Sequence, residues 1–278
     1  MHGQPPASSR GRLRTLGLRP RKGLSQSFLD DRSIAAAIVR AARLDPARDA
    51  VLEVGPGLGV LTELLVRAAR QVVAVELDPD LASWLRSEFG ASVTVHTADI
   101  LKFDPSGVFE SDFVVVANLP YHVASPALRH LLEGGPPFAS RLVVMLQAEV
   151  AERITARPGN LSGLAVGIQV QATAKLVRKV SRNAFYPSPK VDSAVLMLEP
   201  LPDPERLVPR ADQQAFAKLV QAGFKQPRKT LGNSLAEGLG IPKPLAVQLL
   251  DRAQVDASRR PQELKLEAWA RLFRAHAS

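Results

Sequence analysis

Short apolar runs and amphipathic stretches alternate through the middle of the chain. Apolar residues at helical spacing predict helices at 33–44, 60–69, 79–89, 125–133 and 148–156. Apolar runs predict strands at 50–55, 72–77, 92–99, 113–118, 141–147, 167–173 and 192–199. Because strands and helices alternate, we expect an α/β fold with a Rossmann-like, mostly parallel sheet. No helix is predicted between the last two strands, so we expect an antiparallel hairpin to close the sheet.

A proline-rich stretch at 199–209 interrupts this alternation and indicates a linker. Beyond it, only helical patterns follow, within 212–224, 233–239, 244–253 and 261–276. We therefore predict three parts: a basic flexible arm at 1–22, an α/β domain at 23–202, and a small all-helical domain at 203–278.

Composition narrows the classes of function. The chain has no cysteine, which excludes disulfides, thiolate metal sites and cysteine nucleophiles. The five histidines show no metal-ligand spacing, so we expect no metal, and no apolar run is long enough to predict a membrane span. The net charge is +9, carried by residues 1–23 and 205–278 while the middle is slightly acidic. Basic ends favour a nucleic-acid partner over a merely solvated surface.

Three predicted strands end in residues that suit a nucleoside. Gly55, Gly57 and Gly59 follow the first strand of the sheet and open a helix, where backbone can approach a ligand closely. Glu76 ends the next strand, at the position from which a carboxylate usually holds a ribose. Asp99 ends the third strand beside Ile100, within reach of an adenine amine. A dinucleotide is less favoured, because Val60 occupies the place of the third glycine in that motif.

Asn118, Leu119, Pro120 and Tyr121 follow the next apolar strand, beside this expected pocket. An amide oxygen and a backbone carbonyl can accept the hydrogens of an exocyclic amine, and an aromatic ring can stack on the base that carries it. Two acceptors favour the pyramidal form of the nitrogen, which returns electron density to it, so no strong base is needed. Proline stiffens the turn. The pattern suits methyl transfer to an adenine amine, although a proline turn with a buried asparagine and a core tyrosine would look similar.

The chain resembles the ribosomal RNA adenine dimethyltransferases, and among them the small-subunit (kasugamycin-sensitivity) branch. The resemblance runs from about residue 20 to the C-terminus. It rests on several segments in one order: SQSFL (25–29), EVGPGLGVLT (53–62), VELDPDL (75–81), NLPY (118–121), MLQAEVAERI (145–154), FYPSPKVDSAV (185–195) and RKTLGNSL (228–235).

The resemblance implies a class I methyltransferase domain that uses S-adenosylmethionine as its cofactor. It implies that the cofactor is held by Ser27, Leu29, Gly55, Gly57, Glu76, Leu77, Asp99, Ile100 and Asn118. It also implies that Asn118 and the carbonyls of Leu119 and Pro120 bind the target amine, while Tyr121 and Phe185 sandwich a flipped adenine. The family usually has asparagine at the position of Ser27, and arginines at those of Pro227 and Gly232.

The implied activity is dimethylation of two adjacent adenines in a hairpin near the 3′ end of small-subunit (16S) RNA, within an immature 30S particle. The basic arm and the helical domain would bind phosphates. We expect a cytoplasmic monomer, or an organelle-matrix protein if residues 1–22 are a transit peptide. Three other functions stay open: a large-subunit methyltransferase of the macrolide-resistance branch, a non-catalytic assembly or transcription factor of the same fold, and, less favoured, a NAD-dependent enzyme.

Overall fold

The computed structural model describes residues 8–121 and 123–277, apart from the side chain of Lys22. Its residue contacts divide the chain into two compact units. Unit 1 comprises Met1–Ala151 and Lys175–Leu198, and unit 2 comprises Glu152–Ala174 and Glu199–Ser278. The sequence placed the boundary at 202/203, and the structure differs by assigning residues 152–174 to the helical unit.

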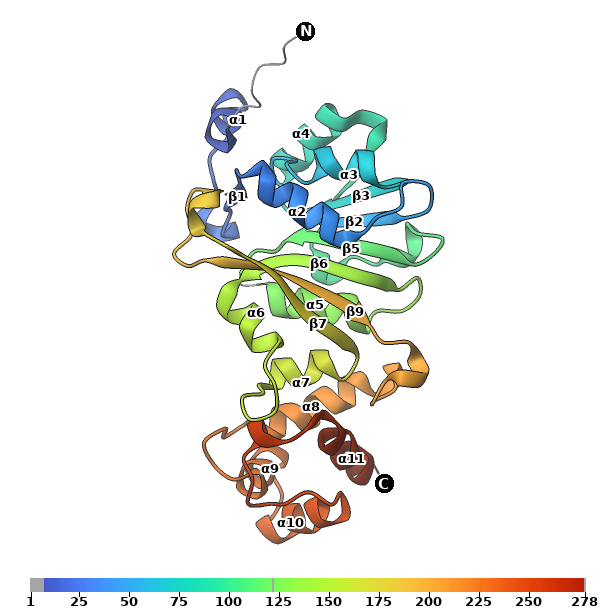
Figure 1. The fold of residues 1–278 in the computed structure, drawn as a ribbon, viewed down its shortest axis with the longest axis vertical. Helices are drawn as coiled ribbons and strands as arrows, with labels where there is room; N and C mark the ends of the chain where they lie inside the picture. Colours follow the sequence, from blue (N-terminus) through green and yellow to red (C-terminus); the bar gives the residue numbers. More distant parts are fainter. Residues whose placement is uncertain (1–7, 122, 278) are drawn as a thin grey trace. The chain divides into compact units, whose positions relative to one another are not determined.

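Within the described residues, a seven-stranded sheet forms the centre of the α/β fold, in the order β4-β3-β2-β5-β6-β9-β7 (Figure 1). The first five strands in this order are parallel, and β9 runs antiparallel to β6. The expected mostly parallel sheet with an antiparallel closing strand is therefore confirmed. Its strands are β2 (Ala50–Val54), β3 (Gln71–Glu76), β4 (Thr94–Thr97), β5 (Phe113–Asn118), β6 (Ala139–Gln147), β7 (Ala172–Val180) and β9 (Ser193–Pro200).

Helices cover both faces of the sheet because the central strands are apolar on both sides. One face packs on α2 and α3, whose buried Ile38 and Leu65 join strand residues such as Val116 in one cluster. The buried residues of α5 lie outside that cluster and contact the other face at β6. The helices before and between these strands are α2 (Arg32–Ala42), α3 (Thr62–Ala68), α4 (Pro79–Phe89), α5 (Ala124–Glu133) and α6 (Ala148–Ile154).

The order in which the chain adds strands to the sheet reverses at β2. From β2 the sequence continues outward through β3 and β4 on one side, whereas β5 and β6 lie on the other. At such a switch point the loops after two neighbouring strands diverge and leave a crevice at the carboxyl edge of the sheet. The glycine turn after β2 and the Asn118 turn after β5 are the two sides of this crevice.

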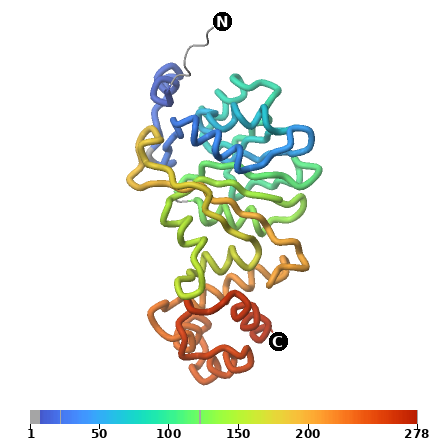
Figure 2. The backbone as a smooth tube through the Cα atoms, in the orientation of Figure 1, coloured from blue at the N-terminus to red at the C-terminus, as the bar shows by residue number. Residues whose placement is uncertain are grey.

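A second, two-stranded sheet joins distant parts of unit 1. Strand β1 (Phe28–Leu29) pairs antiparallel with β8 (Phe185–Tyr186), with Phe28 opposite Tyr186 and Leu29 opposite Phe185. Figure 2 shows the blue segment before α2 beside the yellow segment that precedes β9. The pairing anchors residues 24–29 over the carboxyl edge of the main sheet, where they border the crevice.

Residues 9–15 form a helix, α1 (Ser9–Thr15), which the sequence did not predict; residues 1–7 of the expected arm lie outside the described residues. Ser8 caps the helix by accepting a hydrogen bond from the Gly11 backbone amide. Leu13 is buried with Phe28, Leu58 and Leu81. A helix this short is marginal alone, so these tertiary contacts account for it.

Unit 2 has its own helical core. Its helices are α7 (Gly163–Gln169), α8 (Gln213–Gly223), α9 (Leu231–Leu239), α10 (Lys243–Arg252) and α11 (Leu266–Ala277). Phe216 and Trp269 are fully buried in this core, together with Ala165 and Val166 of α7. The Gly159 amide also donates to the Gln262 carbonyl at 2.9 Å. These contacts explain why residues 152–174 group with the C-terminal residues.

The predicted strand at 167–173 is wrong. Its first three residues belong to α7, which Ser162 caps by accepting a hydrogen bond from the Ala165 amide at 3.2 Å, and only its last two belong to β7. Val170 suggested a strand, but it is buried in the core of unit 2 at the C-terminal end of this helix. The true strand is β7, whose exposed and largely basic residues 175–179 lack an apolar alternation.

Candidate active site

The glycine turn after β2 takes a backbone conformation that few other residues adopt. Gly55, Gly57 and Gly59 all have positive φ, at 66°, 57° and 72°. The Gly55 amide donates to the Val75 carbonyl at 2.9 Å, which keeps the turn close to β3. A Cβ on Gly57 would lie 3.0 Å from the Phe28 ring, so this position has no room for a side chain. The turn therefore presents backbone rather than side chains to the crevice.

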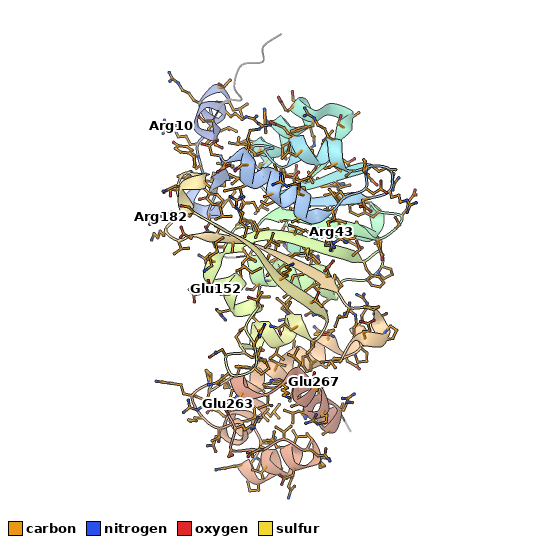
Figure 3. All side chains as sticks on the ribbon, in the orientation of Figure 1. Arg10, Arg43, Glu152, Arg182, Glu263 and Glu267 are labelled. Atoms are coloured by element: carbon orange, nitrogen blue, oxygen red, sulfur yellow. The ribbon has the colours of Figure 1, made fainter. Side chains whose placement is uncertain are left out.

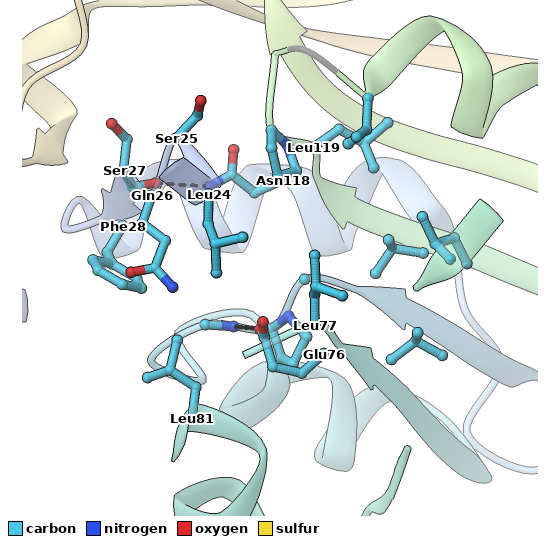
Figure 4. A pocket seen from close by; sticks show the side chains of 18 of the residues that line it. Leu24, Ser25, Gln26, Ser27, Phe28, Glu76, Leu77, Leu81, Asn118 and Leu119 are labelled. Carbon is cyan, nitrogen blue, oxygen red and sulfur yellow. Dashed lines mark hydrogen bonds between the residues drawn. The ribbon is translucent and has the colours of Figure 1, made fainter. Parts of the chain in front are cut away.

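Glu76 at the end of β3 is held by two backbone amides. Gly57 donates to Oε2 at 3.1 Å and Asp78 donates to Oε1 at 2.9 Å (Figure 4). The side chain is only 6% exposed, and burial raises the pKa of Glu76 while these amides act in the opposite direction. Glu76 thus has a fixed orientation at the edge of the glycine turn.

Three further predicted residues line the same space. Asp99 follows β4 and accepts a hydrogen bond from the Leu101 amide at 3.0 Å, which fixes its carboxylate. Leu77 is 51% exposed although it is a large apolar residue, and Ile100 is buried. An exposed leucine beside two carboxylates gives this end of the crevice an apolar wall with polar groups at its margin, as purine-binding sites require.

The Asn118 turn is tied to the chain on both sides. The Asn118 amide nitrogen donates to the Ser27 carbonyl at 3.3 Å, which leaves its amide oxygen as the acceptor (Figure 4). The Leu119 amide donates to the Met145 carbonyl of β6, and the Val123 amide donates to the Pro120 carbonyl. The Tyr121 hydroxyl shares a hydrogen bond of 3.0 Å with the buried Ser193 hydroxyl. The turn therefore offers an oriented amide oxygen next to a ring held at its outer end.

One cavity joins these groups. It holds about 1110 Å³ of space that opens to solvent, and all of its lining residues belong to unit 1. The predicted residues that line it are Ser27, Leu29, Gly55, Gly57, Glu76, Leu77, Asp99, Ile100, Asn118, Leu119, Pro120 and Tyr121. Residues from four strand ends thus surround one space large enough for a nucleoside-sized ligand.

Phe185 is the predicted site residue that the structure does not place on the cavity wall. Its ring is 6% exposed and packs in the core with Leu29, Ile34 and Val180. Its pairing with Leu29 across β1 and β8 turns the side chain inward. In this conformation Phe185 supports the strand that carries Ser27 and Leu29, while the neighbouring Tyr186 is the more exposed ring.

The sequence alone did not single out several residues of the site. Leu24, Ser25, Gln26 and Phe28 also line the cavity. Glu53 is fully buried in β2 beneath the glycine turn, where its Oε2 accepts a hydrogen bond from the Thr62 hydroxyl at 2.7 Å and its Oε1 has no hydrogen-bond partner among the described residues. A charged residue inside an apolar strand was the signal that could have identified Glu53.

Arg12, a residue of the arm that was expected to bind phosphates, contacts the glycine turn from α1. Its guanidinium donates to the Leu58 carbonyl of the glycine turn at 2.9 Å and pairs with Glu63 in the first turn of α3. Arg32 pairs with the same carboxylate. Burial acts to raise the pKa of Glu63, but the hydrogen bonds and charges of the two arginines outweigh it and lower the pKa overall.

Neither a metal-ligand group nor a membrane-spanning helix is found in the part of the chain that the structure describes. No group of three or more potential metal-ligating side chains occurs there. No described helix is both long and apolar enough to cross a membrane.

A doubly wound sheet with a glycine turn, a buried carboxylate and an Asn-Leu-Pro-Tyr turn at one crevice is a class I methyltransferase fold. The family model for ribosomal RNA adenine dimethylase matches residues 17–277. The chain belongs to this family, whose members are methyltransferases.

Curated relatives support the same assignment. The chain is 41% identical over 264 residues to ribosomal RNA small subunit methyltransferase A of Dehalococcoides mccartyi (strain CBDB1), covering 94% of this chain and 89% of that protein. It is 42% identical over 255 residues to the protein of the same name from Desulfitobacterium hafniense (strain DSM 10664 / DCB-2), covering 90% of each.

Solved structures agree on the fold. The 23S rRNA methyltransferase ErmE is 32% identical with a TM-score of 0.68, covering 90% of this chain and all of that one. A dimethyladenosine transferase from Plasmodium falciparum is 26% identical with a TM-score of 0.74, covering 88% of this chain and 95% of that one.

Proposed function

We propose that this protein transfers methyl groups from S-adenosylmethionine to the exocyclic amines of two adjacent adenines in a hairpin near the 3′ end of 16S RNA, during assembly of the small ribosomal subunit. The observation that carries this proposal is the single cavity that joins the glycine turn, Glu76, Asp99 and the Asn118 turn. The names of the curated relatives support the small subunit as the substrate. The protein would act as a monomer in the cytoplasm on RNA within an immature 30S particle.

The cavity fits the proposed cofactor. The glycine turn is a cradle that a Cβ on Gly57 would fill, so a ligand can lie directly on backbone. Glu76 would hold the ribose hydroxyls, Leu77 and Ile100 would contact the two faces of the adenine, and Asp99 would accept from its amine. Ser27 and Leu29 would cover the methionine end. Bound S-adenosylmethionine supplies an electrophilic methyl group on its sulfonium.

The Asn118 turn would activate the target amine. The Asn118 amide oxygen would accept one of its hydrogens, because the amide nitrogen already donates to Ser27. We assign the second acceptor to the Leu119 carbonyl, since the Pro120 carbonyl already accepts from the Val123 amide. Two acceptors localise the nitrogen lone pair, and the proton released after methyl transfer can pass to water at the open side of the cavity.

Tyr121 would stack on the adenine once this base has left its helix. Its ring lines the cavity, and the Ser193 hydroxyl holds its outer end. Phe185, which the resemblance placed on the other side of the adenine, would have to leave its buried position to do so. We therefore assign the stacking to Tyr121 in this conformation.

Methyl transfer from labelled S-adenosylmethionine tests the proposal on three substrates: naked 16S RNA, 23S RNA and immature small subunits that lack the modification. We expect dimethyladenosine on the immature subunits. Asn118→Ala should lower the rate about 10²–10³-fold, the usual cost of removing one positioned polar group from an active site. Tyr121→Ala should also lose activity, whereas Tyr121→Phe keeps the ring and should retain most of it.

Each other outcome identifies a different function. Label on 23S RNA would make the protein a large-subunit methyltransferase, as the name of the 23S rRNA methyltransferase ErmE describes that protein. Binding of the subunits without label on any substrate would indicate an assembly factor. Equal loss in Tyr121→Phe and Tyr121→Ala would contradict a stacking role for the ring.

A further inference from the structure

One segment of unit 1 differs in charge from the residues around it. Residues 175–191 contain five basic side chains and no acidic one. This segment lies within the slightly acidic middle region, 24–204, whose other residues include 12 basic and 20 acidic side chains. The net charge of the whole region therefore conceals the basic segment. The five are Lys175, Arg178, Lys179, Arg182 and Lys190, and each is exposed.

The segment begins on an edge strand with an uncovered face. β7 ends the order of the main sheet, so one of its sides has no neighbouring strand among the described residues. The alternating residues Lys175, Val177 and Lys179 share one face of β7 and are all exposed, and Arg178 is exposed on the other face near Asp31. The cations are thus presented along the edge rather than covered by a helix.

Protection of the sheet edge does not account for the whole segment. Lysines on an edge strand prevent unwanted strand pairing. However, Val177 is 39% and Val191 45% exposed, which such protection would avoid. The basic residues also continue beyond the strand, with Arg182 and Lys190 in the connection to β9, where there is no edge to protect.

The connection between β7 and β9 adjoins the cavity. The Ser27 hydroxyl donates to the Pro187 carbonyl at 3.0 Å, and Ser193 contacts the Tyr121 hydroxyl at 3.0 Å. Both Ser27 and Tyr121 line the cavity. The segment therefore reaches the cavity wall at Pro187, between Arg182 and Lys190.

Hydrogen bonds within the connection hold its cations in place. The Arg182 amide donates to Asp192 at 2.9 Å, its guanidinium donates to the Lys190 carbonyl at 3.4 Å, and its carbonyl accepts from the Ser188 hydroxyl at 3.0 Å. Arg10 of α1 lies over the neighbouring Tyr186 ring at 6.0 Å. Figure 3 shows Arg10 and Arg182 projecting at the same margin of unit 1.

We propose that the segment 175–191 binds the phosphate backbone of the RNA that flanks the target adenines, and so guides the strand toward the cavity. This inference rests on the proposed function for its substrate. RNA fits the surface because phosphates complement a row of exposed cations beside the proposed base-binding cavity. The two exposed valines can contact sugars and unstacked bases, as single-stranded RNA allows.

The test is the salt dependence of binding to a 16S RNA hairpin and to immature small subunits, with the full chain. The variant is Lys175→Gln/Arg178→Gln, and the matched control is Arg40→Gln/Arg67→Gln, which changes two exposed arginines on α2 and α3. Each lost phosphate contact should lower the slope of log K against log salt by about 1. Raising the salt from about 50 to 200 mM weakens RNA binding by some factor in each protein. This factor should be about sixteen times smaller for the variant than for the wild type, and the control should match the wild type.

Cofactor affinity and thermal unfolding show whether the variant is folded, since neither residue lines the cavity. An unchanged slope on both substrates would overturn the proposal. A loss of binding to particles without a loss on the hairpin would also overturn it, because the partner would then be a ribosomal protein. These results do not depend on turnover: absence of methyl transfer by the wild type would reject the proposed function, while the slopes would still decide whether this surface binds RNA.

Discussion

Glu53 is a buried carboxyl group beneath the glycine turn, and its burial changes its protonation. It is fully buried in β2, one residue before the strand ends, and within the described part of the chain one of its oxygens has no hydrogen-bond partner. Burial raises the pKa of Glu53 to about 8, with a smaller upward contribution from the Glu76 charge and an opposing one from Thr62. The side chain is therefore mostly a neutral acid at neutral pH, which explains how an unpaired oxygen is tolerated there.

This neutral acid predicts a pH dependence of stability. The folded protein binds the Glu53 proton more tightly than the unfolded chain, so stability from this group is complete below the unfolded pKa of 4.5 and is lost as pH rises toward about 8. The loss is at most about 1.4 kcal/mol per pH unit in the free energy of unfolding. Glu53→Gln keeps the shape and the bond from Thr62 but cannot ionise.

Urea unfolding of both proteins at about pH 5, 6.5 and 8 measures the difference. We expect the free energy of unfolding of Glu53→Gln to fall less between these pH values than that of the wild type. The same pH slope in both proteins would contradict a raised pKa at this position. Asp99→Asn is not a suitable control, because Asp99 belongs to the proposed cofactor site.

The conformation of single residues was the least predictable part of the site. Sequence patterns identified the strand ends that carry Gly55, Glu76, Asp99 and Asn118, because apolar runs bounded by polar residues define where strands stop. They could not show that Phe185 turns into the core, since its direction is set by the pairing of β1 with β8, about 157 residues apart in sequence.

At the scale of the element, α1 supports the proposed cofactor site in a way that helix propensity could not reveal. It has only seven residues, so its stability comes from the tertiary contacts of Leu13 and Arg12 rather than from helix propensity. Both of its main contacts, Phe28 and Leu58, line the cavity. The helix therefore holds two walls of the cavity in place.

Removing the contact of α1 with the glycine turn should weaken cofactor binding. Arg12→Gln loses a charged hydrogen bond to the Leu58 carbonyl and the ion pair with Glu63. We expect the dissociation constant for S-adenosylmethionine to rise about tenfold, from the usual worth of a hydrogen bond to a charged group. Isothermal titration calorimetry measures it.

Arg14→Gln is the matched control, because Arg14 lies on the same helix and is exposed. It should bind the cofactor as the wild type does. If both variants weaken the affinity equally, the effect would come from net charge rather than from the contact with Leu58.

Elements were predicted well where burial on both faces produces continuous apolar runs, as in β2, β3, β5 and β6. The sequence patterns did not predict α7 or β7 correctly. Val170 suggested a strand, but it is buried in the helical core of unit 2. The exposed edge strand β7 has cations where a half-buried strand would alternate, so no apolar period was present to detect.

At the scale of the whole molecule, each of the two units is stabilised by its own hydrophobic core. The cavity is lined only by residues of unit 1, whereas Phe216 is fully buried among residues of unit 2. Phe216→Ala should therefore lower the stability of unit 2 by about 3–5 kcal/mol, the usual cost of such a truncation, and leave cofactor affinity unchanged.

Fluorescence can follow each unit, since Trp84 belongs to unit 1 and Trp269 to unit 2. Phe216→Ala combined with Trp84→Phe reports unit 2, and combined with Trp269→Phe it reports unit 1. Phe113→Ala, at a buried position of β5, is the control that should destabilise unit 1. A fall in cofactor affinity in Phe216→Ala would show that the cavity depends on the core of unit 2.

The pairing of β1 with β8 also sets a limit on when the protein becomes functional during its synthesis. Phe28 and Leu29 leave the ribosome early, but their partners Tyr186 and Phe185 follow only after six strands of the main sheet. A nascent chain that ends before β8 therefore has no anchor for residues 24–29, which form one wall of the cavity. Each copy completes its pocket only when most of the chain has been translated, so translation itself delays the first methyl transfer until the connection that adjoins the cavity is present.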